Sequence, residues 1–192
     1  MFLMRLKMYK HIPNALTILR FLLVPVFVYM LFICPCPNSA LISLIIFVVA
    51  SLTDYVDGFL ARRWKVISDF GKIMDPLADK LLVLTALIGL TWLEPFRLPL
   101  AIFIIILSRE IGITILREVM QKKGIVVAAD KLGKLKTVMQ MLGIIFALAA
   151  MALLPDISSG MILGVRIWFW LVVVITVLSG LNYLKALFGK EA

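Results

Sequence analysis

Apolar runs of about membrane-spanning length fill most of this chain and leave only short segments between them. A helix needs about 20 mostly apolar residues to cross the hydrocarbon core of a bilayer. Six runs approach or exceed that length, and 63% of the 192 residues are hydrophobic. These runs cover residues 17–35, 39–60, 74–93, 98–116, 137–154 and 161–184. The sequence therefore predicts an all-α polytopic membrane protein with six transmembrane helices.

The segments between the runs are too short to hold a separate soluble module, so we expect a single transmembrane domain over residues 1–192. Residues 2–12 mix apolar and basic side chains before Pro13, which predicts a short helix lying along the membrane interface. The first run is longer than a signal-peptide core and no small-x-small cleavage site follows it. We therefore expect the first run to remain as a membrane span.

The only two cysteines, Cys34 and Cys36, fall between the first and second runs. A bridge between cysteines two residues apart is strained. We therefore expect two thiols there, and neither a redox pair nor a metal site.

Positive charge lies almost entirely on one side of the predicted spans. If the N-terminus is cytoplasmic, 18 of the 20 Lys and Arg residues fall on the cytoplasmic side, and only Arg97 and Arg166 fall outside. Loops this short follow the positive-inside rule, so both termini are predicted to be cytoplasmic. The net charge of +9 then matches anionic lipid headgroups. Nucleic acid is disfavoured as a partner because the basic residues are divided among membrane-flanking loops.

Four aspartates interrupt this apolar pattern, at the end of the second run and the start of the third. Each carboxylate at membrane depth costs roughly 2.5 kcal/mol or more, so a group of four requires a compensating cation. Residues three or four apart on a helix share a face. Asp54 and Asp57 therefore project together, as do Asp75 and Asp79, and the hairpin between them brings the two faces together.

The chemistry of this cluster favours Mg²⁺ or Mn²⁺, because hard divalent cations prefer carboxylate oxygens and no His or Cys lies within the cluster. Gly58 and Gly71 would let a substrate phosphate approach closely, and Pro76 suits the first turn of the third helix. The alternative to a metal site is that the aspartates form ordinary salt bridges with nearby Arg and Lys residues at the membrane interface. A magnesium transporter is disfavoured because the third run has no polar path beyond Asp79.

The aspartates form part of a longer frame, Asp54-x-x-Asp57-Gly58-x-x-Ala61-Arg62-x8-Gly71-x-x-x-Asp75-x-x-x-Asp79. This frame resembles the signature of the CDP-alcohol phosphatidyltransferase family at every fixed position. The resemblance implies a homodimer of six-helix subunits in a bacterial plasma membrane, with a site for two Mg²⁺ or Mn²⁺ ions facing the cytoplasm. It also implies transfer of a phosphatidyl group from a CDP-linked lipid to an alcohol, with release of CMP.

The resemblance also implies roles for individual residues. Asp54, Asp57, Asp75 and Asp79 would bind the metal, and Asp79 would also act as the general base. The residues expected beside the CDP moiety are Gly58, Ala61, Arg62 and Gly71. Asn14 would line the same nucleotide site or cap the first helix, and both interpretations remain open.

A second group of charged residues lies near the cytoplasmic end of the fourth run and beyond it. Arg109 and Glu110 lie within the apolar run, where a charge exposed to lipid is costly, so we expect the pair to face the protein interior. Arg117 lies two helical turns after Arg109 and shares its face. With Lys134 and Lys136 these arginines would form a cationic pocket for an acceptor that carries its own phosphate. Lys122 and Lys123 are instead ordinary positive-inside residues.

Three looser motifs resemble the bacterial members of the family that use sn-glycerol 3-phosphate. They are Asn14-x-x-Thr17-x-x-Arg20, Ser108-Arg109-Glu110 and Leu132-Gly133-Lys134-Leu135-Lys136-Thr137. The likeness implies that CDP-diacylglycerol and glycerol 3-phosphate give phosphatidylglycerophosphate and CMP. Inositol phosphate, serine or phosphatidylglycerol remain alternative acceptors. A remoter alternative is an intramembrane Mg²⁺-dependent prenyltransferase, although that class is expected to carry a second Asp-rich motif.

Overall fold

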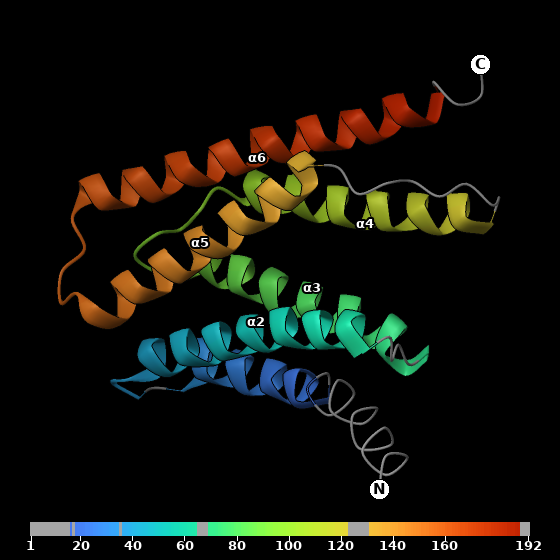
Figure 1. Cartoon of the computed structure of the whole chain (residues 1–192). Coiled ribbons are helices and arrows are strands. Elements are labelled where there is room, and N and C mark those ends of the chain that lie inside the picture. The colour runs from blue at the N-terminus through green and yellow to red at the C-terminus, as the bar shows by residue number, and fades with distance from the viewer. Residues whose placement is uncertain (1–15, 17, 35, 65–68, 123–130, 189–192) are drawn as a thin grey trace, which may run out of the picture. The chain divides into compact units, whose positions relative to one another are not determined.

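The computed structural model describes residue 16 and residues 18–34, 36–64, 69–122 and 131–188. Within these ranges the chain is helical and contains no strand, so the predicted all-α class is confirmed there. The elements are η1 (Tyr29–Ile33), α2 (Ser39–Trp64), α3 (Asp69–Trp92), α4 (Leu100–Lys122), α5 (Lys131–Leu153) and α6 (Ser159–Phe188) (Figure 1). The interfacial helix predicted at 2–12 and Asn14 lie outside the described residues.

Two of the described helices are long and apolar enough to cross a membrane, namely Lys131–Leu153 and Ser159–Tyr183. Shorter apolar helices cover Ile18–Ile33, Ser39–Thr53 and Lys80–Trp92. Because a lipid core offers no water to the backbone, long helices with internal hydrogen bonds are the expected form of such apolar segments. The helices coincide in place with the six apolar runs of the sequence.

The start of α3 differs from the sequence-based expectation. The helix begins at Asp69, so Pro76 lies in its interior and not in its first turn. The prediction is wrong because it begins the helix where the apolar run begins, whereas residues 69–73 before that run are helical as well.

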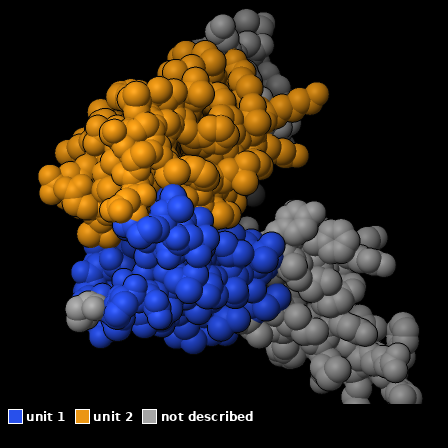
Figure 2. Space-filling view, turned by 90° about the vertical axis from the view of Figure 1, so that its left-hand side faces the viewer, with its two compact units in different colours: residues 1–89, 148–155 blue, residues 90–147, 156–192 orange. Residues whose placement is uncertain are grey.

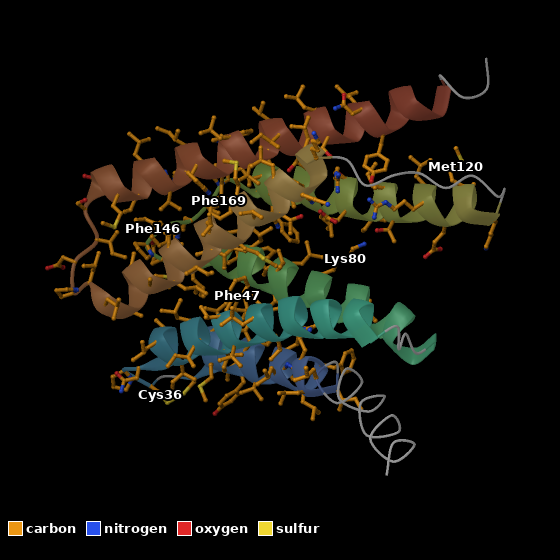
Figure 3. The ribbon with its side chains drawn as sticks, viewed as in Figure 1. Cys36, Phe47, Lys80, Met120, Phe146 and Phe169 are labelled. Atoms are coloured by element: carbon orange, nitrogen blue, oxygen red, sulfur yellow. A yellow bond between two sulfur atoms is a disulfide. The ribbon has the colours of Figure 1, made fainter. Side chains whose placement is uncertain are left out.

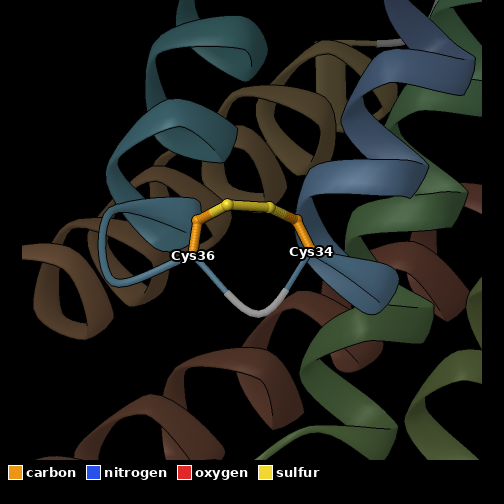
Figure 4. The surroundings of a disulfide bond; sticks show 2 residues. All are labelled: Cys34 and Cys36. Atoms are coloured by element: carbon orange, nitrogen blue, oxygen red, sulfur yellow. A yellow bond between two sulfur atoms is a disulfide. The ribbon is translucent and has the colours of Figure 1, made fainter.

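Cys34 and Cys36 form a disulfide, which corrects the expectation of two thiols (Figure 4). Their Cα atoms are 5.3 Å apart, within the range of roughly 4.4–6.8 Å that a disulfide accepts. The bridge links the residue after η1 to the short segment that leads into α2.

The chain forms two compact units, and the first comprises residues 1–89 and 148–155 (Figure 2, blue). In this unit η1 packs against α2. The ring centroid of Phe47, which is labelled in Figure 3, lies 6.0 Å from that of Phe27. Arg20 is fully buried, and its Nε donates a hydrogen bond to the backbone oxygen of Ala50 at 3.4 Å. The α2 backbone thus receives a charged side chain from the first apolar helix.

The second unit comprises residues 90–147 and 156–192 (Figure 2, orange). Here α4 packs against α6, and the two helices run in the same direction (Figure 1). The indole nitrogen of Trp168 donates to the backbone oxygen of Met139 at 2.9 Å, which joins α6 to α5. A Cβ at Gly143 would lie 2.7 Å from that indole ring. Only glycine therefore allows the ring to lie this close to α5.

The short connection before α4 is held by Arg166 of α6. Its Nε donates to the backbone oxygen of Phe96 at 3.1 Å, and its Nη2 donates to that of Arg97 at 3.3 Å. The side chain of Arg97 forms an exposed ion pair with Glu94 at 2.8 Å. Arg166 therefore donates hydrogen bonds to backbone oxygens of the connection before α4. The sequence predicts that this connection lies on the external side of the membrane.

Candidate active site

The aspartate frame lies on two helices of the first unit. Asp57 lies seven residues before α2 ends at Trp64, and Asp75 lies six residues after α3 begins at Asp69. Asp54 and Asp79 are each ten residues from those same two ends. From the connection between them α2 and α3 run in opposite directions (Figure 1). With a rise of about 1.5 Å per residue, the four aspartates fall at two matched heights along the helix pair.

The backbone at the remaining positions of the frame is also helical. Gly58, Ala61 and Arg62 lie on α2, and Gly71 lies on α3. The side chains of the frame are outside the part of the structure that is described, so their predicted roles stay predictions. Among the side chains that are described, no group of three or more His, Cys, Asp or Glu comes together.

The predicted acceptor cations lie on two helices of the second unit. Arg109 and Arg117 lie on α4, and Lys134 and Lys136 lie on α5. We call these four residues the basic face.

The carboxylate of Glu110 joins two members of the basic face. Its Oε1 forms an ion pair with Nζ of Lys136, and Nη1 of Arg109 lies 3.6 Å from the same oxygen. The side chains of Arg109 and Glu110 are 13% and 18% exposed, so the predicted inward-facing pair is confirmed. Lys136 is 2% exposed. A lysine buried this deeply is tolerated when a carboxylate compensates its charge.

Helix α6 holds both arginines of the basic face. Nη2 of Arg109 donates to Oγ of Ser179 at 2.8 Å, and Nη2 of Arg117 donates to the hydroxyl of Tyr183. The guanidinium carbon of Arg117 also lies 5.1 Å from the centroid of the Tyr183 ring, within cation–π range. Both arginines therefore share one face of α4, as their eight-residue spacing predicts, and that face contacts α6.

The four cations of the basic face differ in how open they are. Lys136 is buried and Arg109 is nearly so, whereas Arg117 and Lys134 are exposed. Gly133, in the first turn of α5, lies close to two of these groups. A Cβ at this position would lie 3.4 Å from Oγ of Ser179 and 3.7 Å from Nη2 of Arg109. This glycine brings the first turn of α5 against the Arg109–Ser179 hydrogen bond.

Sequence reasoning missed Ser179 and Tyr183, because isolated hydroxyl side chains are common in apolar helices. A signal was present in their spacing. Together with Thr176 they follow the i, i+3, i+7 pattern of one helical face, and all three are buried. A buried polar stripe on a membrane helix indicates contact with polar groups of a neighbouring helix.

Comparison with known proteins shows the family of this chain. The family model for CDP-alcohol phosphatidyltransferase matches residues 10–181 of this chain. A relative from Bacillus subtilis (strain 168), named CDP-diacylglycerol--glycerol-3-phosphate 3-phosphatidyltransferase, is 38% identical, with 90% of this chain and 93% of the relative covered. Relatives of the same name come from Salmonella paratyphi A (39% identical, 93% and 96% covered) and Rickettsia typhi (35% identical, 92% and 97% covered).

The family match spans most of the chain and includes both the aspartate frame and the basic face. Several relatives exceed 30% identity over at least nine-tenths of the chain. This chain belongs to the CDP-alcohol phosphatidyltransferase family.

Proposed function

We propose that this chain is a membrane enzyme that transfers the phosphatidyl group of CDP-diacylglycerol to sn-glycerol 3-phosphate. The products are phosphatidylglycerophosphate and CMP. The observation that carries the choice of acceptor is the set of three cations, Arg109, Arg117 and Lys136, that α4 and α5 supply and that side chains of the second unit hold. The printed names of the Bacillus, Salmonella and Rickettsia relatives support the same reaction.

The donor site in this proposal is the aspartate frame. Its donor set suits Mg²⁺ or Mn²⁺, because each of two helices supplies two carboxylates at one-turn spacing. We assign Asp54, Asp57, Asp75 and Asp79 to holding two such ions. Bound there, the ions would offset negative charge on the pyrophosphate as the phosphoanhydride opens.

Asp79 has a second role as the general base. The acceptor hydroxyl oxygen forms a bond to the phosphatidyl phosphorus while the bond from that phosphorus to the CMP oxygen breaks. The hydroxyl proton moves to the Asp79 carboxylate. The position of Asp79 farther along α3 than Asp75 separates the base from the other carboxylate of that helix by one turn.

The remaining frame positions would hold the nucleotide. Gly58 and Gly71 leave room for the CDP moiety to approach the helix backbones, and Ala61 adds only a methyl group. Arg62 offers a planar fork of donors to phosphate. Asn14 is assigned to the same nucleotide and lies before the described residues.

The acceptor phosphate is assigned to the basic face. Arg109 and Arg117 supply forks of N–H donors, which suit phosphate oxygens. Lys134 is exposed and adds a further positive charge. Lys136 is paired with Glu110, so its proposed role is to add positive charge and to hold the carboxylate that also contacts Arg109.

The proposal includes the membrane arrangement. A single domain of six spans would place both termini, the aspartate frame and the basic face on the cytoplasmic side of a bacterial plasma membrane. The helical segments of the fold and the distribution of Lys and Arg support this topology. A homodimer is proposed from the family resemblance alone, since lipid-facing and partner-facing apolar surfaces have the same composition.

An acceptor panel tests the proposal. Purified protein with CDP-diacylglycerol and Mn²⁺ should release CMP most efficiently with glycerol 3-phosphate, compared with inositol phosphate, serine or phosphatidylglycerol. Equal or faster release with inositol phosphate, serine or phosphatidylglycerol would refute the proposed acceptor. A chelator should abolish release, and added Mg²⁺ or Mn²⁺ should restore it. Turnover that persists in excess chelator would refute the metal assignment.

A further inference from the structure

We infer that Ser179 and Tyr183 of α6 are positioning residues for the acceptor, because they hold Arg109 and Arg117 in the orientation that receives its phosphate. The inference deepens the proposed function and rests on it. Neither side chain belongs to the aspartate frame or to the basic face. Both lie on α6, near the cytoplasmic end of the predicted last span.

The environment of Arg109 fixes its guanidinium. Nη2 donates to Oγ of Ser179, a fully buried hydroxyl. On the same helix, a Cβ at Gly180 would lie 3.7 Å from Cγ of Arg109, so the stem of the arginine passes over this glycine. The bond to Ser179 and the ion pair of Nη1 with Glu110 at 3.6 Å together orient the group.

Arg117 is held differently, because both the hydroxyl and the ring of Tyr183 contact its guanidinium. The Tyr183 hydroxyl accepts a hydrogen bond from Nη2, and the ring lies beneath the guanidinium at 5.1 Å. Tyr183 is 3% exposed whereas Arg117 is exposed. A buried, rigid anchor thus restrains a long side chain that otherwise samples many rotamers. Ordering that side chain in advance lowers the entropic cost of binding.

The charges of this cluster favour a particular class of acceptor. Arg109, Lys136 and Glu110 contact one another and carry a net charge of +1. Arg117, held by Tyr183 two turns farther along α4, raises the sum to +2. A phosphate monoester carries a charge of about −1.5 to −2 at neutral pH. A phosphate monoester dianion therefore balances this site, whereas an uncharged polyol or a zwitterionic amino acid does not.

Two conservative variants test the positioning role. Tyr183→Phe keeps the ring and removes the hydroxyl, and Ser179→Ala removes the other acceptor. Each should raise the KM for glycerol 3-phosphate about fivefold to tenfold, while kcat and the KM for CDP-diacylglycerol change by less than about twofold. Purified full-length protein and CMP release provide the measurement.

Thr176→Val is the matched control. Thr176 is on the same face of α6 and equally buried, but its hydroxyl donates to the backbone oxygen of Val172 within its own helix. We expect no change in the KM for glycerol 3-phosphate. If this control shifts that KM as much as Ser179→Ala does, the effect comes from α6 packing and the positioning role is refuted.

A double-mutant cycle tests whether Tyr183 acts through Arg117. If it does, adding Tyr183→Phe to Arg117→Lys should raise the KM for glycerol 3-phosphate by less than about twofold beyond the single lysine variant. Independent, multiplicative effects would overturn the inference. Failure of the wild-type protein to saturate with glycerol 3-phosphate would instead refute the proposed function, which separates the two failures.

Discussion

The aspartate frame and the basic face handle charge in opposite ways. The fixed positions of the frame supply four carboxylates and a single arginine, so we predict that the frame takes positive charge from a ligand. In the basic face, Arg109, Arg117 and Lys136 each have a partner within the second unit. The comparison teaches that the proposed role of the frame requires a bound cation, whereas three cations of the basic face are already held by protein side chains. Damage to the frame should therefore stop turnover, and damage to the basic face should weaken acceptor binding.

The largest expected effect is at the base. Asp79→Asn keeps the size of the side chain and removes its ability to take a proton, so CMP release should fall by about 100-fold or more. Binding of CDP-diacylglycerol, measured separately, should survive. Asp156→Asn is the control, because Asp156 is exposed and lies between α5 and α6, outside the frame. Near-normal turnover in Asp79→Asn would remove the proposed base and weaken the contrast between the two regions.

A smaller effect is expected at the open end of the basic face. Arg117→Ala removes a charged donor to the acceptor phosphate, so the KM for glycerol 3-phosphate should rise by about 10- to 100-fold. The KM for CDP-diacylglycerol should stay within about twofold. Lys122→Ala, an exposed cation in the last turn of the same helix, should change neither value. A parallel rise in both KM values for Arg117→Ala would show that the arginine does not discriminate between the substrates.

The smallest effect on turnover is expected at Glu110, where stability should change instead. Glu110→Gln leaves the charge of Lys136 buried without its carboxylate, at a cost of about 3 kcal/mol. For a chain of this size the apparent Tm should fall by about 6 °C or more. The matched control is Glu94→Gln, because the ion pair of Glu94 with Arg97 is 66% and 65% exposed, and its loss should shift Tm by about 1 °C or less. Equal Tm shifts in the two variants would show that the buried Lys136–Glu110 pair stabilises the protein no more than the exposed Arg97–Glu94 pair does.

The two regions also differ in how far a sequence can predict them. The frame lies within two consecutive helices, so local spacing is enough to place Asp54 and Asp57 on one helix and Asp75 and Asp79 on the next. The contacts of the basic face join residues 70 and 66 positions apart. No local period encodes which residue of α6 meets Arg109 or Arg117. The spacing of Ser179 and Tyr183 marks a polar face of α6, but their partners on α4 are determined only by the packing of the two helices.

The two local errors of prediction have a common origin. The expectation for Pro76 treats the apolar run as the whole helix, and the expectation for Cys34 and Cys36 excludes a bridge because the residues are close in sequence. In each case the expectation rests on a general rule and not on the path of the backbone. Helix α3 begins five residues before the apolar run, and the backbone between η1 and α2 brings the two cysteines within bonding distance.

The ion pair between Glu110 and Lys136 also bears on how the protein is built. The ribosome makes α4 before α5, so the carboxylate in the middle of α4 exists for a time without the lysine that neutralises it. In the proposed topology, where α4 spans the bilayer, a carboxylate at its centre opposes insertion by on the order of 2.5 kcal/mol. Arg109 of the same helix offsets part of that cost, and Lys136 of α5 offsets more. The proposed topology therefore predicts that α4 inserts more readily together with α5 than alone.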